Sequence, residues 1–361
     1  MKVLLLTRYT RAGASSRLRS LQYVEMLTEL GVDFQVAPLL DDNYLQALYN
    51  GQRKSLPALV RTYARRLRIL LHARDFDIIW IEKELFPNLP SWFEQLLPRS
   101  STPYVVDYDD AIFHNYDQAR NPIKSLLKNK IGNVMRRSAM VIAGNSYLAD
   151  YASRAGAAVT IIPTVIDIRR YPPPVELPSG EPFVIGWIGS PSTVKFLAPV
   201  MPLIARLAAL FPIELNIVGA TVDTLRYPFA RNVPWREHTE VEEIERFDVG
   251  IMPLPDGPWE RGKCAYKLIQ YMACGKAVVA SPVGMNVDVV QHGLSGLLAS
   301  SEEQWFQALS DLLSNPTLRL SMGRVGRAQV EEKYCLQVAV PRLLAVFEQV
   351  ISERKKRRCV E

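Results

Sequence analysis

Two lysines stand four residues apart, just behind a loop rich in glycine and proline. The loop follows an apolar stretch, residues 248–253, that is typical of a strand, and Lys263 and Lys267 come after it. We expect a helix to open near Gly262 and to close at Gly275, with both lysines on one face of its first turns. The free N–H groups and the dipole of a helix start favour an anion. The pattern predicts a diphosphate site, and the plainer alternative is a pair of solvated lysines.

The elements that must position these residues are short apolar runs that alternate with helical patterns. Because the runs lack polar alternation, they favour parallel sheets covered on both faces, with right-handed crossovers. The sequence therefore predicts an α/β fold with two doubly wound domains. The expected strands are residues 3–7, 34–38, 78–82, 104–107, 141–143 and 159–162 in the first half, and 183–188, 214–218, 249–253, 277–280 and 296–299 in the second.

A proline-rich segment separates the two sets of strands. We expect a first domain over residues 1–168, a linker over 169–182, a second domain over 183–340, and a C-terminal helix and basic tail over 341–361 that can cross back to the first domain. Ligands of open α/β sheets bind outside the carboxyl ends of the strands. We therefore expect the two domains to face a cleft and the chemistry to lie in the loops after the strands.

Composition excludes several classes of protein. The 361 residues are 48% hydrophobic and 22% charged, too apolar for a disordered chain. No apolar run approaches the roughly 18 residues of a spanning helix, and Arg8 interrupts the apolar start too early for a signal peptide. The four cysteines lack a C-x-x-C spacing and lie far from the histidines, so neither a disulfide framework nor a zinc cluster is expected. These features predict a cytoplasmic protein.

The net charge of +6 belongs to the first half of the chain. Residues 1–180 hold 23 Lys and Arg against 17 Asp and Glu, whereas residues 181–361 hold 20 of each. Residues 53–74 carry seven basic and no acidic side chains among apolar residues at helical spacing, and residues 118–149 also lack acids. A basic amphipathic helix suits an anionic membrane surface or an acidic glycan. We expect peripheral contact with the inner membrane face; a solvated helix is the alternative, and no motif indicates nucleic acid.

A family resemblance comes from residues 267–281 (Lys-Leu-Ile-Gln-Tyr-Met-Ala-Cys-Gly-Lys-Ala-Val-Val-Ala-Ser) and 291–298 (Gln-His-Gly-Leu-Ser-Gly-Leu-Leu). They resemble the donor-binding segment of retaining glycosyltransferases of the GT-B fold, family four, which has two Rossmann-like domains. Residues 183–197 and 162–167 also resemble that family. The resemblance implies transfer of a sugar from a nucleoside diphosphate sugar, with retention and without a metal or other cofactor. The implied acceptor is a glycan or a polyprenyl-linked glycan, in the synthesis of a cell-surface polysaccharide or glycolipid.

The chain departs from this family at its paired glutamates, whose places are taken by Gly262 and Gln270. It therefore resembles a variant that lacks both carboxylates. The resemblance implies that the amide of Gln270 can hold the ribose and that Glu260 can meet the sugar hydroxyls. The full set of residues that it implies for the donor is Gly189, Ser190, Lys195, Glu260, Arg261, Lys263, Lys267 and Gln270, with Lys267 also catalytic.

On the acceptor side, the resemblance points to the loop after the strand at residues 104–107. Asp107, Asp109 and Asp110 occupy the place where an acceptor would meet the sugar, so one of them can orient a hydroxyl or stabilise positive charge on the ring. An Asp-x-Asp metal site of the GT-A type and a helix-capping cluster are the alternatives. The loop at residues 7–19 resembles the first loop of the family. This resemblance implies acceptor contacts from Ser15, Arg17 and Arg19.

Two rival functions stay open. A dehydrogenase or nucleotide-sugar epimerase would need a Gly-x-Gly-x-x-Gly loop after a strand, and residues 7–19 lack that pattern. A non-catalytic protein that binds a nucleotide sugar or a glycan would explain the missing glutamates as lost activity. Assays of sugar transfer, compared with assays of binding, distinguish such a binding protein from an enzyme.

Overall fold

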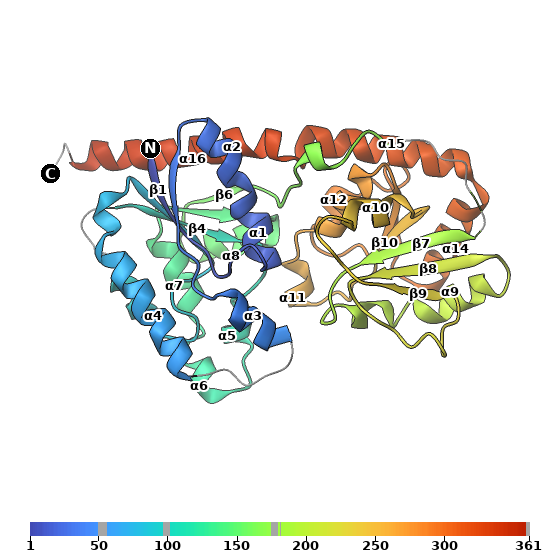
Figure 1. Ribbon diagram of the computed structural model, residues 1–361, viewed down its shortest axis with the longest axis horizontal. Coiled ribbons are helices and arrows are strands. Elements are labelled where there is room, and N and C mark those ends of the chain that lie inside the picture. The colour runs from blue at the N-terminus through green and yellow to red at the C-terminus, as the bar shows by residue number, and fades with distance from the viewer. Residues whose placement is uncertain (50–55, 97–101, 175–179, 181, 359–361) are drawn as a thin grey trace. The chain divides into compact units, whose positions relative to one another are not determined.

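The computed structural model describes residues 1–49, 56–96, 102–174, 180 and 182–358 (Figure 1). Arg53, Lys54 and Cys359, which the sequence reading used, lie outside these residues. The chain forms two compact units. Unit 1 comprises Met1–Thr164 together with Val338–Glu361, and unit 2 comprises Val165–Gln337.

Unit 1 is built on a parallel six-stranded sheet in the order β2-β1-β3-β4-β5-β6. Its central strands are mostly buried and apolar, as expected for a sheet that helices cover on both sides, and their charged residues lie at or near the strand ends. The strands are β1 (Lys2–Leu6), β2 (Asp33–Val36), β3 (Ile78–Glu82), β4 (Tyr104–Tyr108), β5 (Met140–Ala143) and β6 (Val159–Ile161).

Helices flank this sheet (Figure 1). The last helix of the chain packs on unit 1, where the ring of Phe347 lies 5.5 Å from that of Trp80 and Arg342 Nη2 donates to the carbonyl of Ile161 at 2.7 Å. The helices described in unit 1 are α1 (Ala14–Arg19), α2 (Val24–Glu29), α3 (Asp42–Tyr49), α4 (Leu56–Leu71), α5 (His114–Asp117), α6 (Pro122–Ser125), α7 (Lys130–Arg137), α8 (Ser146–Arg154) and α16 (Leu336–Arg358), with 3₁₀ turns η1 (Leu21–Tyr23), η2 (Ala73–Asp75) and η3 (Ser91–Leu96).

Unit 2 repeats this architecture with a parallel sheet in the order β12-β11-β10-β7-β8-β9. Its strands are β7 (Phe183–Ile188), β8 (Ile213–Val218), β9 (Ala230–Val233), β10 (Val249–Met252), β11 (Ala277–Ala280) and β12 (Leu297–Leu298). Its helices are α9 (Met201–Ala208), α10 (Glu240–Glu245), α11 (Pro258–Arg261), α12 (Tyr266–Ala273), α13 (Asn286–Val289), α14 (Glu302–Ser314) and α15 (Pro316–Lys333), with 3₁₀ turns η4 (Ile168–Arg170) and η5 (Val194–Leu197). The predicted α/β fold of two doubly wound domains is confirmed.

Strand β9 is absent from the sequence prediction. It is an edge strand that pairs only with β8, and its middle residues, Arg231 and Asn232, are polar. An edge strand has no partner on its outer side, so it needs no apolar pattern there. The sequence signal on which the other strands depended is therefore missing.

Both sheets have a switch point, where the chain stops adding strands on one side and begins on the other. In unit 1 it lies between β1 and β3, and in unit 2 between β7 and β10. The crevice outside the carboxyl ends of two such strands is the usual ligand position in open α/β sheets. The candidate residues are therefore best examined at these two places.

No helix among the described residues has the length and the apolar content that a membrane crossing requires.

Candidate functional site

The unit 2 switch point combines the loop after β7 with the loops after β10. Gly189 follows β7, and its N–H donates to the carbonyl of Val218 at 2.9 Å. The segment after β10 forms the short helix α11 and then α12. The prediction of one helix opening near Gly262 is wrong, because the chain leaves helical geometry between Arg261 and Tyr266. Lys263 therefore precedes α12, and only Lys267 lies in its first turn.

Ala265 caps the start of α12 with a φ of 51°, in the left-handed region that residues with a Cβ seldom adopt. Such a conformation is unfavourable and persists only where the surrounding structure holds it. Ala265 is buried, as is its neighbour Leu268. The strained residue thus fixes the direction in which α12 begins and with it the position of Lys267.

Lys267 is a cation without an acidic partner. Its Nζ lies 4.0 Å from the centre of the Trp187 ring, and no carboxylate in the part of the chain that the structure describes pairs with it. Burial, reinforced by the nearby charge of Lys263, lowers the pKa of Lys267 to about 7. A bound anion would reverse this shift, because an opposite charge favours the protonated amine. The electrostatics of the site therefore favour an anion.

Gly189 is required beside this lysine. A Cβ at Gly189 would lie 2.2 Å from the Trp187 ring and 2.8 Å from Lys267 Nζ. Both distances are shorter than van der Waals contact, so a side chain would displace the ring or the amine. Without a side chain at Gly189, the Nζ lies close to the backbone of the loop after β7. Strand end, ring and lysine thus form one cluster, which we call the Lys267 cluster: Trp187, Gly189 and Lys267.

The other predicted phosphate-loop residues are engaged locally. The N–H of Ser190 donates to Thr193 Oγ1 at 3.0 Å, and the Ser190 hydroxyl lies 2.9 Å from that of Ser192. These bonds close the loop into a tight turn. Lys195 Nζ lies 5.3 Å from the Phe196 ring. The donor roles of Ser190 and Lys195 stay predictions.

The remaining donor candidates differ in exposure. Arg261 is exposed and forms a two-point ion pair with Asp256, at 2.7 and 3.0 Å. Glu260 is half-buried and directs Oε2 toward Gly257, where a Cβ would lie 2.5 Å from it. Gln270 is buried, and its Nε2 donates to the hydroxyl of Tyr171 at 3.1 Å. Its ribose role stays a prediction, and in the structure its amide anchors α12.

The unit 1 switch point is organised around Glu82, the last residue of β3. Its carboxylate accepts hydrogen bonds from the N–H of Arg8 at 2.8 Å, the hydroxyl of Ser15 at 2.8 Å and the hydroxyl of Ser16. Glu82 is 1% exposed. The buried carboxylate thereby ties the loop after β1 and the start of α1 to the end of β3.

Lys83 and Asp109 form the second part of this cluster. Lys83 has a φ of 65°, and its Nζ lies 2.8 Å from Asp109 and 3.6 Å from Asp110. Ser15 also donates to Asp109, at 3.1 Å. Burial opposes ionisation of Asp109, but the charge and the hydrogen bond of Lys83 outweigh it and hold the pKa of Asp109 below its ordinary value. Ser15, Glu82, Lys83 and Asp109 are called the Asp109 cluster below.

Asp107 points into the interior of unit 1. Arg19 Nε donates to it at 2.7 Å, and Arg19 Nη1 donates to the carbonyl of Ile162 at 2.9 Å. Both side chains are buried, and burial raises the pKa of Asp107 to about 6 despite the arginine. Arg17 is also buried and donates to the carbonyl of Arg11. The structure thus places Arg17, Arg19 and Asp107 in internal contacts, and their acceptor and catalytic roles stay predictions.

The sequence gave no functional role to Trp187, and of Glu82 and Lys83 it predicted only that one could face the cleft, with pairing to neighbouring residues as the alternative. Trp187 precedes Gly189 by two residues, and an aromatic side chain so close to a glycine loop is the signal that could have indicated it. Glu82 ends an apolar strand, where a carboxylate needs buried donors. Among the described residues, no three His, Cys, Asp or Glu side chains gather as metal ligands would. The prediction of metal-independent chemistry stays a prediction.

Comparison with known proteins identifies the class of this fold. Residues 182–315 match the family model described as glycosyl transferases group 1. Sucrose-phosphate synthase from Thermosynechococcus elongatus superposes with a TM-score of 0.74 at 16% identity, over 98% of this chain and 100% of that one. HepE from Anabaena, in complex with UDP-glucose, gives 0.71 at 15% identity, over 97% and 100%. These likenesses show the fold.

A curated relative, the uncharacterized glycosyltransferase MJ1069 of Methanocaldococcus jannaschii, is 29% identical over 96 residues. The match spans 26% of this chain and 24% of that protein. The GT-B fold predicted from the sequence is confirmed. Residues 182–315, which match the family model of glycosyl transferases group 1, hold the Lys267 cluster.

Proposed function

We propose that this protein is a glycosyltransferase that moves a sugar from a nucleoside diphosphate sugar to a glycan or polyprenyl-linked acceptor. The observation that carries the proposal is that no carboxylate among the described residues pairs with Lys267, at the switch point of the segment that matches the group 1 model. The printed descriptions of similar structures support this choice of ligand, since HepE is described with UDP and with UDP-glucose.

In this proposal Lys267 acts on the leaving group. Negative charge grows on the diphosphate as the bond to the sugar breaks, and a fixed cation stabilises that charge more in the transition state than in the ground state. Lys263 adds to the positive potential, because its charge already lowers the pKa of Lys267 in the absence of an anion. Gly189 lets the backbone of the loop after β7 lie close to the amine and the Trp187 ring, with no side chain between them.

Unit 1 supplies the second half of the proposal. Asp109 is held in its ionised form by Lys83 and fixed by Ser15. An ionised and immobile carboxylate can accept a hydrogen bond from an acceptor hydroxyl or stabilise positive charge on the sugar ring. We propose Asp109, with Asp110 beside it on Lys83, as the residue that does so. Retention at the anomeric carbon and a product of the cell-surface polysaccharide or glycolipid type complete the proposal.

A panel of nucleotide sugars tests the donor assignment. The melting temperature is measured with UDP-, GDP-, ADP- and dTDP-sugars, because a ligand that binds the folded state stabilises it according to its affinity and concentration. We expect one nucleotide class to raise the melting temperature of the wild type and of Lys333→Met, an exposed lysine of α15, but not of Lys267→Met. A response that Lys267→Met retains would refute the assignment.

A transfer assay separates an enzyme from a binding protein. The stabilising sugar nucleotide is incubated with a polyprenyl-linked or soluble glycan acceptor, and release of the nucleoside diphosphate is followed. We expect release that depends on the acceptor and that Asp109→Asn reduces without loss of the thermal shift. If the sugar nucleotide binds but no acceptor causes release of the nucleoside diphosphate, the protein is better described as a non-catalytic binding protein.

A further inference from the structure

The apolar residues of α4 fall on two faces of the helix. Leu70 is buried, and Leu59 and Tyr63 are half-buried, with the Tyr63 hydroxyl donating to the carbonyl of Pro87 at 2.6 Å. Four others are exposed: Leu56 is 73% exposed, Val60 68%, Leu67 37% and Leu71 78%. The sequence alone suggested a single apolar face for this helix, and the structure instead leaves half of its apolar side chains in solvent.

These four side chains are aligned. At 100° per residue, positions 56, 60, 67 and 71 fall within an arc of about 60°, and at 1.5 Å per residue they extend over about 22 Å. Single exposed leucines are normal on protein surfaces, whereas an aligned apolar stripe marks an interaction surface. We call Leu56, Val60, Leu67 and Leu71 the α4 stripe.

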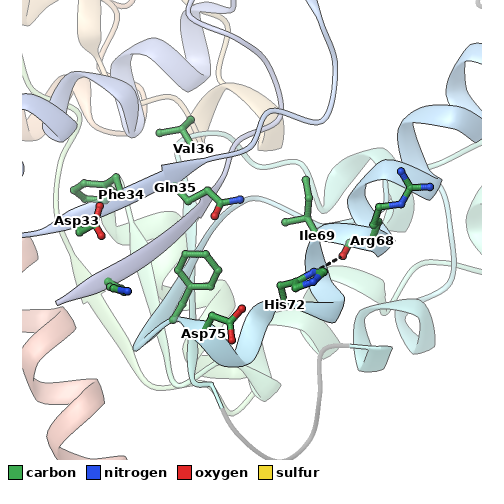
Figure 2. Close-up of a pocket in the computed structure, with 10 residues that line it drawn as sticks. Asp33, Phe34, Gln35, Val36, Arg68, Ile69, His72 and Asp75 are labelled. Carbon is green, nitrogen blue, oxygen red and sulfur yellow. Dashed lines mark hydrogen bonds between the residues drawn. The ribbon is translucent and has the colours of Figure 1, made fainter.

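Basic side chains border this stripe on one side. Arg61, Arg65 and Arg68 are exposed and lie within the half-turn next to the stripe, and Leu56–Leu71 contains no acidic residue. Figure 2 shows Arg68, Ile69 and His72 on the side of α4 that faces β2, around a hollow of about 810 Å³. The fourth arginine, Arg66, is buried and donates to the carbonyls of Thr7 and Ala37, so it anchors the helix.

The arginines beside the α4 stripe indicate which kind of partner binds it. A second copy of the chain, docked through the same face, would bring one row of arginines close to another. A nucleic acid would satisfy the arginines but leave the leucines in water. An anionic bilayer satisfies both, since its acyl chains cover the apolar side chains and its headgroups carry negative charge.

A partly exposed tryptophan is linked to the same helix. The Tyr63 ring packs on Phe86, Phe86 contacts Phe93, and Trp92 stacks on Phe93 with ring centres 3.9 Å apart. Trp92 remains 55% exposed. Tryptophan is enriched where one end of a side chain is apolar and the other is hydrated, as at a membrane interface.

We propose that α4 is a peripheral membrane anchor that lies in the plane of an anionic bilayer. The α4 stripe enters the boundary between headgroups and acyl chains, and Arg61 and Arg68 contact lipid phosphates. Binding requires both the insertion of the apolar side chains and the attraction between arginines and phosphates, so it depends on anionic lipid and weakens with salt. None of these residues belongs to the Lys267 or the Asp109 cluster, and the proposal goes beyond the transfer reaction.

Vesicle flotation tests the anchor with the full chain. Vesicles of phosphatidylcholine alone and of phosphatidylcholine mixed with phosphatidylglycerol are compared at low and physiological salt. We expect the wild type to float with the mixed vesicles and not with the neutral ones. The double variant Val60→Gln/Leu71→Gln should lose about tenfold or more in affinity, because two aliphatic side chains no longer leave water. The readout needs no sugar nucleotide, so its failure would leave the proposed transfer reaction untouched.

A charge variant and matched controls make the result specific. Arg61→Gln/Arg68→Gln should bind mixed vesicles more weakly and with less dependence on salt. Leu225→Gln and Arg226→Gln, exposed positions of unit 2 with the same chemistry, should behave as the wild type. The proposal is overturned if the wild type ignores mixed vesicles or if Val60→Gln/Leu71→Gln binds as well as the wild type. It is also overturned if light scattering shows a dimer that this variant dissociates, because the stripe is then covered by a second copy.

Discussion

The charged side chains at the two switch points differ in whether they have a partner. In unit 1 the charged side chains of the Asp109 cluster have partners: Lys83 pairs with Asp109, and Glu82 accepts from hydroxyls and an N–H. Beside this cluster the buried Arg19 pairs with Asp107. In unit 2 Lys267 has an aromatic ring and a second lysine for neighbours. The same position in two similar sheets thus holds a rigid, compensated network in one unit and an uncompensated cation in the other.

This difference separates structural charge from charge that a ligand completes. A buried pair holds its own geometry and needs nothing from outside, although removing one partner leaves an expensive unpaired charge. An unpaired cation costs stability in the free protein, and an arriving anion removes that cost. Substitutions at the two places should therefore have opposite effects on folding and on binding.

The largest expected effect is on stability in unit 1. Arg19→Met leaves Asp107 buried without its guanidinium and should lower the free energy of unfolding by about 3–5 kcal/mol. Urea denaturation monitored by circular dichroism measures this change. The double variant Arg19→Met/Asp107→Leu removes both charges and should recover most of the loss. If Arg19→Met alone unfolds at the wild-type midpoint, the pair is not the buried, compensated contact described here.

The next largest effect is on transfer in unit 2. Lys267→Met should reduce kcat/KM for the donor by about 10²–10³-fold, the usual range for removal of one preorganised group that stabilises developing negative charge. It should not lower the melting temperature at pH 7, because the partly desolvated charge disappears with the lysine. A variant that loses activity and melts several degrees lower would contradict the contrast between the units. Lys333→Met is the control for the loss of a lysine as such.

The fold was predictable because uniformly apolar runs and their spacing report strand positions directly. The start of α12 was not, since the left-handed conformation of Ala265 depends on tertiary packing, and alanine itself gives no such signal. The burial of Arg19 was equally hidden, because an arginine on a short helix is usually solvated and its partner Asp107 lies 88 residues further along the chain. Of the candidate site, the sequence indicated Lys267 and Asp109, whereas the charge balance around each required coordinates.

A dependence on pH sharpens the comparison. With the pKa of Lys267 at about 7, the free protein carries the charged amine below pH 7 and loses it above. Donor kcat/KM, which reports the ionisation of the free enzyme, should therefore be level below pH 7 and fall by about tenfold per pH unit above it. A pH–rate profile measures this, and Lys267→Arg, which stays protonated, should give a level profile over that range.

Deprotonation of Lys267 should raise the stability of the fold, whereas it lowers kcat/KM. The folded pKa of about 7 lies below the ordinary value of 10.5, so the unfolded chain holds more protons between these limits. The contribution of Lys267 to stability should therefore improve as pH rises from about 7 toward 10.5. The difference in melting temperature between the wild type and Lys267→Met should narrow over this range. A difference that widens would contradict the lowered pKa.

The smallest effect is expected at Ser15. Ser15→Ala removes hydrogen bonds to Glu82 and Asp109 and should lower the free energy of unfolding by about 1 kcal/mol, since Lys83 still neutralises Asp109. Ser15→Thr keeps the hydroxyl and serves as the matched control. A loss as large as that of Arg19→Met would show that Ser15, and not Lys83, holds the cluster together.

The central claim is that the amine of Lys267 binds the phosphates of a nucleoside diphosphate. The pKa of its amine can be measured by NMR titration of the lysine side-chain carbons, with the signal assigned through Lys267→Arg. We predict a pKa near 7 in the free protein and a rise of one unit or more on addition of UDP or of whichever nucleoside diphosphate the panel selects. An ordinary lysine pKa in the free protein, or a value that the bound nucleotide leaves unchanged, would contradict the claim.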